Sequence, residues 1–172
     1  EICSGESFNV EPVNNVDGDI VPLGITYTWD VLVSNCEIPD ASSGMGAVIS
    51  QLLINTSNTI QTVTYEVTPT SGSAGGCLGA TFEVLISVSP TPQVPDEQAE
   101  ICSGESFSFL PVNDPPTTII PIGTTYTWTF GDNSAISGET DGVDQTQFEQ
   151  LNLTNSSNTN QSIVYTVTAE AI

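Results

Sequence analysis

Carboxylates are the side chains of this sequence with the chemistry to form a site. Asp17 and Asp19 flank a glycine in one segment, and four further acids crowd a later one: Asp132, Glu139, Asp141 and Asp144. Calcium takes roughly six to eight oxygen ligands and tolerates irregular loops. The spacing matches no EF-hand, so the sequence leaves two interpretations open, calcium binding and solvated acidic loops. We expect no cofactor other than this possible calcium.

Paired carboxylates could also hydrolyse glycosides, because that reaction needs only Asp and Glu side chains. A catalytic pair further requires a cleft, one acid with a raised pKa and groups that position the substrate. The chain has 21 acids and no Lys, Arg or His, so it lacks both a nitrogen base and a cationic clamp for an oxyanion. We therefore expect no enzyme activity and no catalytic residue.

The formal net charge of −21 limits the partners of the chain. Without cations it cannot neutralise phosphates, so nucleic-acid binding is not expected. Anionic membrane surfaces would repel it, and no apolar run is long enough to insert into a bilayer. Because 38% of the residues are apolar, a folded chain is favoured over a disordered one. The charge then serves solubility and repulsion between neighbouring copies.

The four cysteines are Cys3, Cys36, Cys77 and Cys102. The simplest scheme is a Cys3–Cys77 disulfide, although Cys3 with Cys36 stays open because four cysteines allow three pairings. A Cys3–Cys77 bridge would add up to roughly 4.5 kcal/mol in the loop-entropy model. It would also indicate an oxidising, extracytoplasmic compartment. No CxxC pair is present, so zinc has no support.

A tandem repeat organises the chain. The matching segments are 1–8 with 100–107, 22–29 with 121–128, and 63–68 with 163–168. The first pair is identical in every residue, and the offset is 99 positions for the first two pairs and 100 for the third. A unit of about 100 residues has the size of an immunoglobulin-like sandwich.

These offsets predict the domain organisation. We expect one domain at 1–90, a linker at 91–99, and a second domain at 100–172 that is cut short and lacks its last strand. The alternating prolines of the linker favour an extended, semi-rigid connector of about 3 Å per residue. A sandwich without its last strand would leave an open edge that can recruit another chain.

Apolar and polar residues alternate inside each unit, which is typical of half-buried strands. The alternating apolar positions are Tyr27, Trp29, Val31 and Val33; Val63, Tyr65 and Val67; and Phe82, Val84, Ile86 and Val88. The predicted fold class is all-β, as tandem immunoglobulin-like antiparallel β-sandwiches. This pattern places Trp29, Trp128, Tyr65 and Tyr165 in the cores, and we expect the two tyrosine hydroxyls to bond to backbone groups.

Several of these segments resemble a known family. Residues 126–133, Tyr-Thr-Trp-Thr-Phe-Gly-Asp-Asn, are similar to the Tyr-x-Trp-Asp-Phe-Gly-Asp-Gly signature of PKD-type domains. Residues 27–30 keep Tyr-Thr-Trp-Asp and then depart from it. The segments opening with Ile-Cys-Ser-Gly and containing Gly-Cys-x-Gly-Ala-Thr-Phe are similar to PKD-like repeats of the giant gliding-motility adhesin of Bacteroidota. The resemblance covers nearly the whole chain and implies an immunoglobulin-like sandwich, export to the bacterial cell surface and attachment to substrata.

Two functions follow as hypotheses. In the first, the chain is a structural and adhesive segment of a long secreted surface adhesin. Its partners would be the neighbouring repeats, together with a surface polysaccharide or another substratum. In the second, it is an accessory carbohydrate- or protein-binding module of a secreted degradative enzyme. Binding to one class of polymer would favour the second.

Overall fold

The structure is a computed structural model that describes residues 1–16, 18–34, 36–72 and 75–171. The chain divides into two compact units, Glu1–Pro90 (unit 1) and Thr91–Ile172 (unit 2). Every regular element in the described ranges is a β-strand, which confirms the predicted all-β fold class. The described residues also contain no helix long and apolar enough to cross a membrane.

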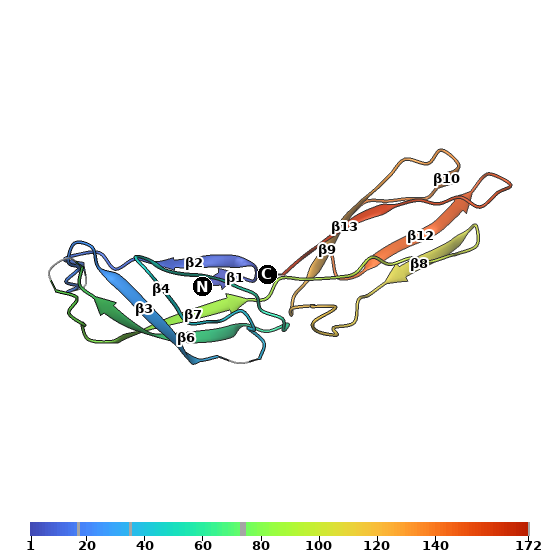
Figure 1. The fold of residues 1–172 in the computed structure, drawn as a ribbon. Helices are drawn as coiled ribbons and strands as arrows, with labels where there is room; N and C mark the ends of the chain where they lie inside the picture. The colour runs from blue at the N-terminus through green and yellow to red at the C-terminus, as the bar shows by residue number, and fades with distance from the viewer. Residues whose placement is uncertain (17, 35, 73–74, 172) are drawn as a thin grey trace. The chain divides into compact units, whose positions relative to one another are not determined.

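Unit 1 packs a five-stranded sheet against a two-stranded sheet (Figure 1). The large sheet has the order β1-β7-β6-β3-β4, and the small one pairs β2 with β5. The strands are β1 (Ile2–Cys3), β2 (Glu6–Val10), β3 (Thr26–Val33), β4 (Gly44–Gly46), β5 (Ile49–Leu53), β6 (Gln61–Thr70) and β7 (Phe82–Ser89). The pairing is antiparallel except between β1 and β7, which run parallel.

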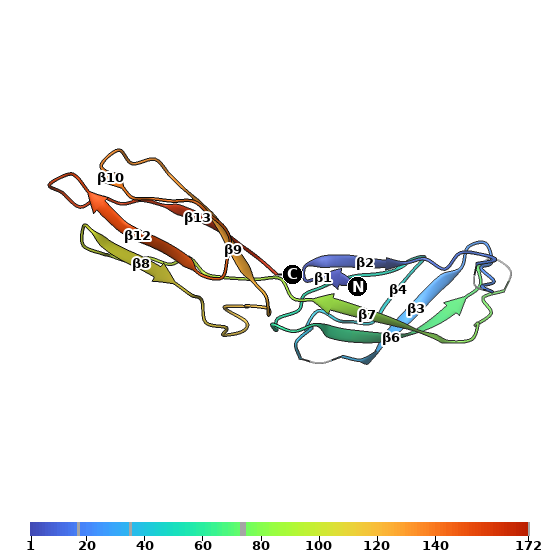
Figure 2. The same ribbon diagram turned by 180° about the vertical axis from the view of Figure 1, so that it is seen from behind.

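Unit 2 consists of two three-stranded sheets, β11-β9-β13 and β10-β12-β8 (Figure 2). Its strands are β8 (Glu105–Phe109), β9 (Thr125–Phe130), β10 (Ile136–Ser137), β11 (Gly142–Gln145), β12 (Phe148–Asn155) and β13 (Tyr165–Glu170). All pairs are antiparallel. Repeat numbering makes β8, β9, β12 and β13 the counterparts of β2, β3, β5 and β6.

Alternation along the strands builds the core of unit 1. Every second residue of β6 and β7 points inward, so that Val63, Tyr65, Val67 and Val88 are all 0% exposed. The expectation for Val33 was wrong, because this residue is 60% exposed. A register shift between Val31 and Val33 interrupts the pairing of β3 with β6, and a shift of one residue reverses the face to which a side chain points.

A β-bulge explains the change of repeat offset from 99 to 100. Gln51 lies opposite Phe8 in unit 1, and Gln150 lies opposite Phe107 in unit 2, which is an offset of 99 in both residues. Leu53 lies opposite Glu6, whereas its counterpart opposite Glu105 is Leu153, an offset of 100. The register of β12 shifts between these points, and Asn152 there has a φ of 53°. The inserted residue is thus accommodated within a strand.

The first residues of the expected linker are part of unit 2. Gln93 exchanges two backbone hydrogen bonds with Ile119, at 2.9 and 2.8 Å, and Val94 packs against the core around Trp128. The expected linker is therefore not free along its whole length, because its residues Gln93 and Val94 already belong to the fold of unit 2.

Candidate functional site

The structure does not gather the predicted calcium ligands into a cluster. In the described ranges, no three His, Cys, Asp or Glu side chains are arranged to hold a metal ion. Asp19, Asp132, Asp141 and Asp144 are exposed and Glu139 is half-buried, while Asp17 lies outside the described residues. The backbone N–H of Asp144 donates to the Thr127 hydroxyl at 3.2 Å. Calcium binding therefore stays a prediction, and the residues that the structure describes form no preformed site for it.

The expected Cys3–Cys77 disulfide does not form in this structure, where all four cysteines are free and exposed. Cys3 lies beside Ser89, at the last residue of β7, whereas Cys77 precedes the first residue of that strand. Eight residues of β7 at about 3.3 Å each separate its two ends by about 23 Å. A disulfide needs Cα atoms about 4.4–6.8 Å apart, so this pairing is geometrically excluded within unit 1.

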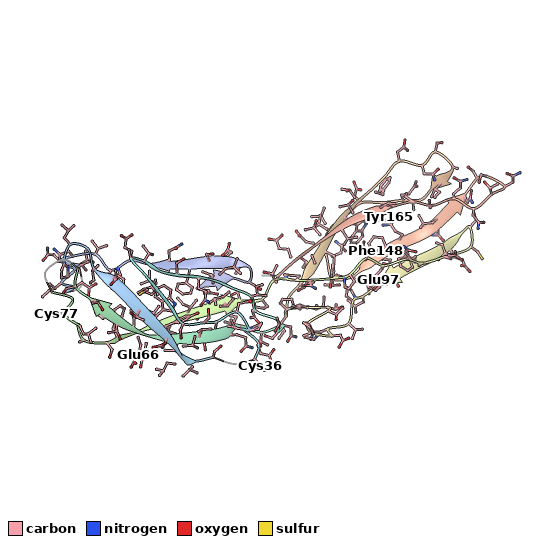
Figure 3. The ribbon with its side chains drawn as sticks, viewed as in Figure 1. Cys36, Glu66, Cys77, Glu97, Phe148 and Tyr165 are labelled. Atoms are coloured by element: carbon pink, nitrogen blue, oxygen red, sulfur yellow. The ribbon has the colours of Figure 1, made fainter. Side chains whose placement is uncertain are left out.

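Cys36 lies at the opposite end of unit 1 from Cys77 (Figure 3). The end that holds Cys36 is also the end of Cys3, because hydrogen bonds connect the flanking residues. The Asn55 N–H donates to the Ser4 hydroxyl at 2.9 Å, and the Thr56 N–H donates to the Glu37 carbonyl at 2.8 Å. Of the pairings that the sequence left open, Cys3 with Cys36 is therefore the one whose members share an end.

Both tryptophans lie in the cores, with Trp29 6% exposed and Trp128 4% exposed. Each indole covers a glycine directly across the sheet, Gly44 opposite Trp29 and Gly142 opposite Trp128. The Trp128 ring N–H donates to the Thr140 carbonyl at 2.9 Å. These rings are consequently part of the packing and not a surface for a ligand.

The two predicted core tyrosines differ. Tyr65 is 0% exposed and its hydroxyl donates to the Gln51 side-chain oxygen at 2.6 Å, so its partner is a side chain and not the expected backbone group. Burial raises the pKa of Tyr65 to about 12. Tyr165 is half-buried and packs on Phe148 with ring centroids 4.9 Å apart (Figure 3). Its hydroxyl is buried with no hydrogen-bond partner among the described residues.

A repeated glutamine attaches a loop to β5 in unit 1 and to β12 in unit 2, and sequence reasoning missed it. In unit 1 the Gln51 side chain accepts from the Ser42 N–H at 3.2 Å and donates to the Asp40 carbonyl at 2.8 Å. In unit 2 Gln150, 0% exposed, accepts from the Thr140 N–H at 2.9 Å and donates to the Thr140 carbonyl at 2.8 Å. The sequence contained a signal for it, because a glutamine recurs in both units at a strand position where alternation predicts an inward-facing side chain.

A repeated asparagine organises the turn that follows the same strands. The Asn55 side chain, 1% exposed, accepts from Ser57 and donates to the carbonyls of Thr59 and Val88 at 2.8 and 2.9 Å. Asn155 makes the same contacts with Ser157 and Thr159. Both asparagines begin Asn-x-Ser sequences, but these structural bonds occupy the side chain that a glycan would need.

The described surface exposes few aromatic rings. Its aromatic rings are buried or half-buried except Phe130, which is 37% exposed. A shallow, open hollow beside β11 in unit 2 is lined partly by Trp128, Asp141, Gln147 and Glu149. With acids on its rim and no cation in the chain, this hollow lacks the groups that would orient an anionic substrate.

The two immunoglobulin-like sandwiches share the polar side chains that hold their strands and turns together, and this arrangement defines a class, the β-sandwich repeat module. The family model for the PKD-like domain matches residues 1–92 and again residues 98–171. The chain belongs to the PKD-like domain family and carries two members in tandem. Such domains are typically extracellular adhesive or structural modules without catalysis. Comparisons with curated proteins and with solved structures found no match.

Proposed function

We propose that this chain is a structural and adhesive repeat segment of a long secreted surface adhesin, of the kind that serves gliding motility in Bacteroidota. The observation that carries the proposal is the use of the shared polar side chains. Ser4 and Ser103, Asn55 and Asn155, and Gln51 and Gln150 make corresponding internal hydrogen bonds in the two units. The polar residues that the two units share therefore stabilise the fold of each module.

Charge and repetition support the same proposal. The net charge of −21 keeps neighbouring fibres apart and soluble. Weak polar contacts that are repeated along a fibre give tight overall binding, because each contact raises the effective concentration of the next. An adhesin of this design needs no deep pocket in any one repeat, in agreement with the shallow surface of the described residues.

Surface labelling on the source bacterium tests the proposal. Fab fragments raised against the purified chain should label intact cells without permeabilisation and should reduce the number of cells that attach to glass. Fab fragments against an unrelated surface protein of similar abundance are the control. Labelling that requires permeabilised cells, or full attachment on cells saturated with the Fab, would contradict the proposal.

A polymer-binding measurement separates the alternative, an accessory module of a degradative enzyme. The purified chain is applied to an array of polysaccharides and to immobilised proteins. The adhesin proposal predicts no saturable binding to a single polymer class by this two-repeat segment. Micromolar binding to one class, lost after substitution of Phe130, the exposed aromatic residue, would favour the accessory module instead.

A further inference from the structure

The outer face of the large sheet in unit 1 carries an exposed apolar row. Leu85 of β7 lies opposite Thr64 of β6, and Thr64 lies opposite Val33 of β3. Leu85 is 65% exposed and Val33 is 60% exposed, and the adjoining Leu32 is 51% exposed. Contiguous exposed apolar side chains, unlike single ones, mark surfaces that bind other molecules. This apolar row is therefore a candidate docking surface, and the charges beside it determine which kind of molecule can bind there.

A row of three carboxylates runs beside the apolar row on the same strands. Glu66 of β6 lies opposite Asp30 of β3 on one side and opposite Glu83 of β7 on the other (Figure 3). All three residues are exposed. Like charges directly opposite each other on neighbouring strands destabilise a sheet. This acidic row therefore lowers the stability of unit 1, and a cationic molecule bound along it would remove the repulsion.

The β-sandwich fold requires neither row. Where unit 1 has Asp30 and Glu66, unit 2 has two threonines. Thr129 and Thr166 lie opposite each other there, in the same register. At the position of Val33, unit 2 has an aspartate. The acidic row and the apolar row are thus features of unit 1 in particular, and the sheet of unit 2 forms without them.

A molecule that binds this face must supply positive charge. The chain has 21 acids and no Lys, Arg or His, so neither a second copy nor another segment of this chain can neutralise the acidic row. A small polyamine would pair with the acids but would leave the apolar row in water. A protein segment with both cationic and apolar side chains contacts both rows. The partner that fits is therefore a basic, amphipathic segment of another protein.

The spacing of the acids favours a helix over an extended segment. Neighbouring strands lie about 4.8 Å apart, so the three acids on β3, β6 and β7 span about 10 Å across the strands. On a helix, residues i, i+3 and i+7 share one face and span about 10.5 Å. In an extended segment, residues i, i+2 and i+4 span about 13 Å. A helix that lies across the strands therefore places one side chain near each acid.

We propose that the outer face of β3, β6 and β7 binds a helical segment of another protein. Lys or Arg residues on successive turns of this helix face the acidic row, and apolar residues beside them cover Leu85 and Val33. The two rows lie about 7 Å apart along the strands, which is within the width of a helix with its side chains. This inference goes beyond the proposed function, because it assigns a protein partner to unit 1 whatever the whole chain attaches to.

Binding of a designed peptide to the whole chain tests the proposal. The probe is a labelled helical peptide of about 18 residues, with arginine at i, i+3 and i+7 and leucine at i+1, i+4 and i+8. The control peptide has the same composition, with its arginines distributed around the helix. Fluorescence anisotropy should show saturable binding of the probe to chain 1–172, at least about fivefold tighter than binding of the control. Added salt should weaken the binding of the probe.

A variant of the acidic row distinguishes docking on this face from general attraction to an acidic chain. The variant combines Asp30→Asn, Glu66→Gln and Glu83→Gln, and it should bind the probe at least about fivefold more weakly. Its unit 1 should melt about 2–8 °C higher, because two opposed pairs of like charges are removed. The charge-matched control removes three exposed acids elsewhere and should bind within about twofold of wild type. It combines Asp96→Asn, Glu97→Gln and Glu149→Gln.

The apolar row has its own test in Leu85→Ser, which should weaken binding of the probe about threefold. An unchanged affinity would overturn the proposal, because the probe would then contact the acids alone. Equal binding of the two peptides, equal weakening by the two triple variants, or no binding up to about 1 mM would also overturn it. So would a lower melting temperature of unit 1 in the acidic-row variant, because the three carboxylates would then stabilise the sheet.

Discussion

Gly142 lies directly opposite Trp128 on the neighbouring strand, and the indole ring covers the space that a side chain at Gly142 would occupy. Unit 1 repeats the arrangement with Gly44 and Trp29. A β-carbon at either glycine would meet ring carbons far inside van der Waals distance. The glycine is therefore required by the way in which the tryptophan packs, and glycine in a strand often marks such a close approach.

The substitution Gly142→Ala should destabilise unit 2 by about 1–3 kcal/mol, the usual cost of overpacking a core. The indole must tilt or the strands must separate to make room for the methyl group. Urea unfolding followed by tryptophan fluorescence and by calorimetry measures the change. Gly131→Ala is the matched control, because its β-carbon would lie 3.7 Å from the nearest atom, the Val164 carbonyl oxygen. Equal loss in the two variants would contradict the packing explanation.

The sequence predicted the strands that alternate regularly, for a physical reason. Burial of one face selects every second residue, so the sides of β6 and β7 could be assigned from Val63, Val67, Val84 and Ile86 alone. The same rule failed at Val33, because a register shift in the pairing of β3 with β6 depends on the partner strand. Alternation along one strand carries no information about its neighbour.

The candidate sites were harder to predict than the fold. The acidic segments suggested calcium because carboxylates are close in sequence, but closeness in sequence does not make the side chains converge. Gln150 was overlooked because polar residues are mostly exposed, yet it is buried and both accepts from and donates to the Thr140 backbone. The Cys3–Cys77 pairing failed because loop length alone says nothing about which end of a sheet holds each cysteine.

Asn55→Ala should destabilise unit 1 by about 2–3 kcal/mol, because it leaves buried carbonyls and an N–H without partners. Asn155→Ala should destabilise unit 2 by only about 1 kcal/mol, since this side chain is half-buried and its amide donates to the Thr159 carbonyl in an exposed turn. Hydrogen exchange resolved by peptic peptides assigns each loss to its unit. A larger loss for Asn155→Ala than for Asn55→Ala would be inconsistent with these contacts.

Alkaline pH should destabilise unit 1 through ionisation of Tyr65. Its pKa of about 12 in the folded chain lies above the ordinary value of 10.0, so the stabilisation is complete below pH 10 and is lost as the pH rises from 10 to 12. The difference corresponds to on the order of 2–3 kcal/mol. Burial, followed by the charges of Asp19 and Glu11, also raises the pKa of Tyr27, which adds to the loss in the same direction.

The variant Tyr65→Phe distinguishes the effect of Tyr65 ionisation on stability from the effect of Tyr27 ionisation. It removes the ionisable group and one hydrogen bond to Gln51, so it should be less stable near neutral pH and should lose less stability between pH 10 and 12. Circular dichroism with chemical denaturation at each pH provides the measurement, and Tyr165→Phe in unit 2 is the control. Parallel loss of stability in wild type and Tyr65→Phe would show that Tyr65 does not control alkaline unfolding.

The cysteine substitutions Cys3→Ser and Cys77→Ser should each leave the stability of unit 1 within about 0.5 kcal/mol, as expected for exposed residues. The reason is that the two thiols lie at opposite ends of β7 and share no bond. Reductant should likewise leave the melting temperature of the purified chain unchanged. A native Cys3–Cys77 disulfide would instead stabilise unit 1 by up to roughly 4.5 kcal/mol. If both variants lost the same large stability, and reductant caused the same loss in wild type, the disulfide would exist and unit 1 would fold differently.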